Sequence, residues 1–119
     1  MKRALALFLL TLFAGMAELE AHAFLQRADP AVGSTLTRAP NEIKIWFTEG
    51  VEPAFSRIQV FAPSGKEVDK KDVRVDPSNH ALLQVSLPPL QPGSYKVAWR
   101  VVSVDTHVTE GSYSFRVDR

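Results

Sequence analysis

Apolar and polar residues alternate along most of the chain after residue 22. In four segments, 42–47, 81–87, 95–104 and 112–117, the apolar residues recur at every second position. A repeat of two places them on one face of an extended strand. The apolar positions that share a face are Ile43, Ile45 and Phe47; Leu83, Val85 and Leu87; Tyr95, Val97, Trp99 and Val101; and Tyr113, Phe115 and Val117.

Shorter segments complete the pattern, and proline and glycine separate them. Strands are predicted at 24–28 and 57–61, with a short edge segment bracketed by Gly33-Ser34 and Ala39-Pro40. Residues 66–76 are highly charged, which predicts an exposed edge hairpin that resists strand-to-strand aggregation. We therefore expect an all-β domain, a seven-stranded antiparallel Greek-key barrel or sandwich.

The N-terminus has the three-part pattern of a secretory signal. Lys2 and Arg3 precede an apolar run over residues 4–17, and small residues follow. The run is shorter than the roughly 20 residues that span a bilayer. We predict a secretory signal peptide followed by one exported domain. Cleavage after Ala21 or after Ala23 fits the signal rules, and the rules alone do not decide between them.

Composition removes several function classes. The chain has no cysteine, which excludes disulfides, thiolate metal sites and a cysteine nucleophile. Its formal net charge of +1 gives no electrostatic case for binding nucleic acid or an acidic membrane surface. Trp99 is predicted in the core, Trp46 on the face opposite Ile45, and His80 in solvent.

The candidate chemistry lies at the end of the longest predicted strand. Asp105 and His107 are two residues apart, so an extended backbone would point them to the same face. A carboxylate and an imidazole together are good ligands for a divalent transition metal, although a polar turn is the alternative. Two ligands do not make a tight site. His22, if it begins the mature chain, would add an imidazole and a free amine.

Several motifs resemble those of the CopC family of periplasmic copper-binding proteins. They are Ala21-His22-Ala23, Asp29-Pro30, Phe47-Thr48-Glu49-Gly50-Val51, the stretch from Gly93 through Trp99 to Val102-Ser103-Val104-Asp105-Thr106-His107, and Gly111-Ser112-Tyr113-Ser114-Phe115. The resemblance implies a periplasmic protein with cleavage after Ala21, which gives a signal peptide over residues 1–21 and a cupredoxin-like domain over 22–119. It also implies a Cu(II) site formed by His22, Asp105 and His107. Many members have His where this chain has Phe24. Methionine occurs only at positions 1 and 16, so the mature chain is expected to lack the Cu(I) site that some members carry.

These expectations describe a monomer that buffers or carries one Cu(II) per chain without catalysis, in copper resistance or homeostasis. Glu49 is the expected partner of a metal-bound imidazole. An inner-membrane transporter of the CopD type or a periplasmic multicopper oxidase could exchange copper with it. The alternatives are a copper-dependent oxidative enzyme that uses an N-terminal histidine brace, and a metal-free β-sandwich interaction domain.

Overall fold

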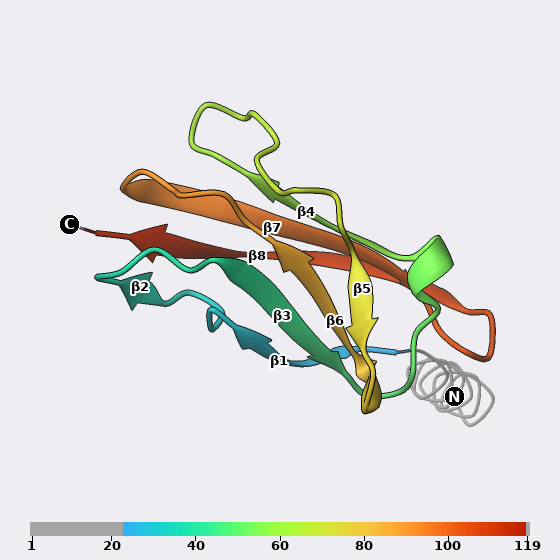
Figure 1. The fold of residues 1–119 in the computed structure, drawn as a ribbon. Coiled ribbons are helices and arrows are strands. Elements are labelled where there is room, and N and C mark those ends of the chain that lie inside the picture. The colour runs from blue at the N-terminus through green and yellow to red at the C-terminus, as the bar shows by residue number, and fades with distance from the viewer. Residues whose placement is uncertain (1–22, 119) are drawn as a thin grey trace, which may run out of the picture.

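The computed structural model describes residues 23–118, which form two four-stranded sheets (Figure 1). One sheet has the order β1 (Leu25–Asp29), β3 (Glu42–Phe47), β6 (Asn79–Ser86), β5 (Arg74–Asp76). The other has the order β2 (Thr35–Leu36), β8 (Val108–Val117), β7 (Gly93–Val102), β4 (Arg57–Phe61). A single 3-10 turn, η1 (Pro53–Phe55), precedes β4. Neighbouring strands are antiparallel except β2 and β8, which are parallel.

The core lies between the sheets and contains every apolar face that alternation predicts. All thirteen residues are less than 9% exposed: Ile43, Ile45, Phe47, Leu83, Val85, Leu87, Tyr95, Val97, Trp99, Val101, Tyr113, Phe115 and Val117. The Phe47 and Trp99 rings meet edge to face with centroids 5.1 Å apart. The Tyr95 and Phe115 rings stack at 5.5 Å. Such pairs add to the free energy gained by burying the rings.

The predicted all-β antiparallel fold is confirmed, with differences in detail. The described residues form eight strands rather than seven, because the charged segment contributes β5. That segment lies at sheet edges as expected, but it is not one hairpin. Its beginning pairs with β4 through Glu67 and Phe61, and its end, β5, pairs with β6 at the edge of the other sheet. The segment thus crosses from one sheet to the other, and Asp69 within it is only 8% exposed. The Asp69 carboxylate accepts a hydrogen bond from the Val60 amide at 2.8 Å, which satisfies a buried polar group on each side.

Both tryptophans and His80 lie where the sequence predicts. Trp99 is buried, and Trp46 lies on the outer face, where the Arg27 guanidinium carbon is 3.9 Å from its ring centroid. His80 is exposed and lies near the beginning of β6, directly after the turn at 77–78. Among residues 23–118, there is no helix that is long and apolar enough to cross a membrane. The predicted signal peptide and His22 lie outside the described residues.

A long hairpin of β7 and β8 determines where the candidate site lies. Its pairing runs without a register shift from Gly93 opposite Val117 to Val102 opposite Val108. The segment 103–107 therefore turns the chain at one end of the sandwich, close to η1 and the beginning of β6 (Figure 1).

Gly111 offers a test of how closely this hairpin packs. A Cβ at this position would lie 2.6 Å from Cζ2 of Trp99, a buried ring of the core. Gly111→Ala should lower the free energy of unfolding by about 1–3 kcal/mol, the usual cost of overpacking. The control is Ser112→Ala, because Ser112 is exposed on the other face of the same strand. Urea denaturation measures both, and equal midpoints for the two variants would contradict this packing.

Candidate metal site

The segment 103–107 is a tight turn between β7 and β8. The Ser103 amide donates to the His107 carbonyl at 2.9 Å, and the Thr106 amide donates to the Ser103 carbonyl at 2.8 Å. Thr106 has a φ of +70°, as expected for the last residue of a three-residue hairpin loop. Our argument from an extended backbone is therefore wrong, because β7 ends at Val102. The turn, and not strand alternation, brings Asp105 and His107 together.

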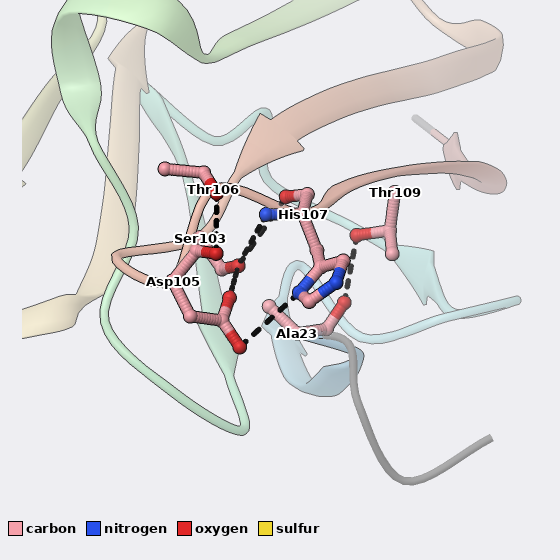
Figure 2. A network of polar contacts seen from close by, with 6 residues as sticks. All are labelled: Ala23, Ser103, Asp105, Thr106, His107 and Thr109. Atoms are coloured by element: carbon pink, nitrogen blue, oxygen red, sulfur yellow. Dashed lines mark hydrogen bonds and ion pairs between the residues drawn. The ribbon is translucent and has the colours of Figure 1, made fainter. Parts of the chain in front are cut away.

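Asp105 and His107 are in direct contact (Figure 2). Nδ1 of His107 is 3.2 Å from Oδ2 of Asp105, and each side chain is 47% exposed. The structure thus joins two of the three predicted ligands at a place that solvent reaches. A carboxylate oxygen and an imidazole nitrogen side by side are two donors of the mixed N,O type that suits Cu(II).

Ser103 holds both residues in place. It is fully buried, and its hydroxyl donates a hydrogen bond to Oδ1 of Asp105 (Figure 2). Oγ of Ser103 also accepts a hydrogen bond from the His107 amide at 3.2 Å. Our sequence analysis did not assign this role to Ser103. The sequence did contain a sign of this role. Residues 95, 97, 99 and 101 point inward, and the same alternation continues to Ser103. A polar residue at an inward position needs a hydrogen-bond partner.

The surroundings of Asp105 keep its carboxyl group ionised. The Ser103 hydrogen bond is the main cause that lowers its pKa to about 2, against an ordinary value of 3.8. Hydrogen bonding and the charge of His107 lower this pKa further, whereas desolvation opposes them. At neutral pH the turn presents a fixed negative charge to any cation.

Two neighbouring segments are joined to this turn through backbone hydrogen bonds. The Val104 amide donates to the Gly50 carbonyl at 3.0 Å, and the Glu52 amide donates to the Val102 carbonyl at 2.8 Å. The Val51 amide donates to the carbonyl of His80 at 3.0 Å. The segment 49–52 is thereby fixed between the turn and β6, and Glu49 directly precedes the residue that is bonded to Val104.

The beginning of the described chain is anchored beside the same turn. Ala23 is 1% exposed, and its carbonyl accepts a hydrogen bond from the Thr109 hydroxyl at 2.7 Å (Figure 2). Thr109 is two residues after His107 and is a second residue that sequence reasoning missed. His22 lies outside the described residues. Within 23–118, the structure has no group of three or more His, Cys, Asp or Glu side chains that could hold a metal ion.

The lowered pKa of Asp105 predicts a definite pH dependence in the metal-free protein. A carboxyl group whose pKa falls on folding stabilises the native state above its unfolded pKa. That contribution is lost as the pH falls from about 4 through about 2. The difference in unfolding free energy between the unaltered chain and Asp105→Asn should be constant above pH 4 and shrink below it. Urea denaturation across this range measures it, and a difference that is independent of pH would contradict the interaction.

Comparison with known proteins gives one consistent result. The CopC domain family matches residues 25–118. The protein YobA of Escherichia coli strain K12 is 39% identical over 98 residues, covering 82% of this chain and 79% of that protein. Copper resistance protein C of Pseudomonas syringae pv. tomato is 38% identical over 106 residues, with 82% of each chain covered. The crystal structure of CopC from Methylosinus trichosporium OB3b superposes with a TM-score of 0.77 at 37% identity, covering 82% of this chain and 94% of that one. The chain therefore belongs to the CopC family.

Proposed function

We propose that this protein binds one Cu(II) ion through His22, Asp105 and His107, and that it buffers or carries copper in the periplasm as part of copper resistance. The observation that carries the proposal is the contact between Asp105 and His107 beside the anchored Ala23. The names of two relatives, copper resistance protein C and a copper transport protein, support copper as the cargo.

The position of Ala23 explains how a third ligand can arrive. The carbonyl of Ala23 accepts a hydrogen bond from Thr109. Residue 22 is joined directly to Ala23, and consecutive Cα atoms are about 3.8 Å apart. If the signal peptide is cleaved after Ala21, His22 offers a free amine and an imidazole that close one chelate ring on a metal. Cleavage after Ala23 would remove both. The proposed site therefore needs cleavage after Ala21.

The donor set favours copper in its oxidised state. One amine, two imidazoles and a carboxylate form an N₃O set, and tetragonal N,O sites suit Cu(II), the tightest-binding divalent ion of its row. The ionised Asp105 adds a negative charge that favours the more positive ion. Residues 22–119 contain no methionine or cysteine, the soft ligands that Cu(I) prefers. We infer a role in binding and carriage rather than in redox catalysis.

Glu49 is the proposed outer partner of a metal-bound imidazole, because histidines that bind metals commonly have such an acceptor. The segment that carries Glu49 is joined to the turn, since the Val104 amide donates to the carbonyl of Gly50. The exposure of Asp105 and His107 leaves copper accessible to an acceptor. A transporter of the CopD type or a multicopper oxidase would be such an acceptor.

A pair of histidine variants tests the site. His107→Ala removes one imidazole and should weaken Cu(II) binding by more than about 100-fold, because losing even a partner of a ligand costs about 10–100-fold. His80→Ala is the matched control, because His80 is an exposed histidine outside the proposed site. It lies in the same region, since its carbonyl accepts a hydrogen bond from the Val51 amide. Competition with a chelator, using the chain that begins at His22, measures both affinities. Equal losses in the two variants would contradict the assignment.

A further inference from the structure

Exposed apolar side chains gather around the proposed copper site. Among the described residues, five large apolar side chains are exposed: Phe24 at 38%, Val32 at 59%, Phe55 at 69%, Val104 at 56% and Val108 at 47%. Four of these, all except Val32, lie at the end of the sandwich that carries the 103–107 turn. We call Phe24, Phe55, Val104 and Val108 the apolar collar. An exposed apolar group gathered in one place, unlike scattered single residues, is typical of an interaction surface.

Hydrogen bonds fix the collar residues around the turn. Val104 lies within the turn, and Val108 directly follows His107. The Phe24 amide donates to the Thr48 hydroxyl and the Thr48 amide donates to the Phe24 carbonyl, both at 2.9 Å. Phe55 ends η1, and its amide donates to the carbonyl of Glu52. Glu52 is itself bonded to Val102 beside the turn, and Figure 1 shows η1 at the same end as the β7–β8 turn.

The connecting segments closest to the turn carry acidic side chains. The segments 48–55, 77–80 and 103–108 contain Glu49, Glu52 and Asp105 and no lysine or arginine, and the nearest arginines are Arg57 and Arg100, a cross-strand pair of β4 and β7. A partner whose surface is complementary must therefore bring positive charge as well as apolar side chains. A second copy of this chain docked end to end would place acidic residues against acidic residues. An anionic lipid surface would meet the same repulsion.

We propose that the apolar collar is the docking surface for a copper-exchange partner protein, whose contact face carries apolar side chains ringed by lysine or arginine. This inference rests on the proposed function, because the collar surrounds the site from which copper would leave. Docking there would cover Asp105 and His107 and exclude water while a ligand of the partner approaches the metal. Phe55, aromatic and the most exposed of the four, is the expected anchor.

The first experiment needs no copper. A peptide rich in leucine and lysine is added to the copper-free, nitrogen-15-labelled protein, and amide shifts are followed by nuclear magnetic resonance. We expect saturable shifts at Gly50, Phe55, Val104 and Val108, and none with a matched peptide in which glutamate replaces lysine. Phe55→Ser with Val108→Thr should weaken binding about tenfold, from the apolar area that is lost. Val32→Thr is the matched control, because Val32 is as exposed as the collar residues but lies in the loop between β1 and β2.

The second experiment measures copper transfer. The same two peptides are extended at the N-terminus with Ala-Ala-His, a sequence that itself binds Cu(II). Copper transfer from the loaded protein to the lysine peptide should be at least about tenfold faster than transfer to the glutamate peptide. Added salt should reduce this difference in rate, because it screens the charges. Phe55→Ser with Val108→Thr should abolish this advantage and leave the Cu(II) affinity of the protein unchanged.

Several results would overturn the inference. They are equal shifts with both peptides, shifts away from the collar, or collar variants that bind as the unaltered protein does. Concentration-dependent shifts at the collar without peptide would identify a second copy as the occupant, and shifts with phosphatidylglycerol vesicles would identify a membrane. If the proposed function is wrong, the protein will not bind Cu(II), which is a different outcome from those above. The copper-free titration would still show whether the peptide binds at the collar.

Discussion

The hydroxyl of Ser103 lies where the core of the sandwich ends and the turn begins. It is the last inward position of the row that runs along β7, and it is fully buried. Through one oxygen it binds the carboxylate of Asp105 and the amide of His107. A buried hydroxyl that lost these partners would be destabilising, so the packing of the core and the geometry of the turn depend on each other. The proposed ligands are thus held by the rigid part of the fold.

The same arrangement explains why the site lies at the end of the molecule. The inner faces of the strands carry apolar side chains, so polar side chains that could bind a metal lie in the connecting segments. The β7–β8 turn, the segment 49–52 and the beginning of the described chain meet there through Gly50, Ala23 and Thr109. Acidic charge without compensating lysine or arginine accumulates in these connections. That charge suits a cation, and the surrounding apolar collar suits a partner that takes it.

Much of the fold could be predicted from the sequence because its apolar residues alternate so regularly. The bounds of β3 and β4 and the inward faces of β6, β7 and β8 follow from that repeat. The crossing at 66–76 could not be predicted, since its many charges suggested solvent while a single one, Asp69, turns inward to a backbone amide. Asp105 and His107 were predicted to lie together from their spacing on an extended strand, and they are in contact, but a turn and not a strand joins them. A turn with threonine at positive φ leaves no mark on the hydrophobic pattern.

The central claim is that a free terminal amine, two imidazoles and the Asp105 carboxylate hold the copper together. Electron paramagnetic resonance of the Cu(II)-loaded protein tests it most directly, by counting the nitrogens bound to the metal. The chain that begins at His22 is compared with one that carries an extra glycine before it, which turns the amine into an amide while every side chain remains. The account predicts three nitrogens in the first and a changed spectrum with weaker binding in the second. The same spectrum and the same affinity in both would contradict it.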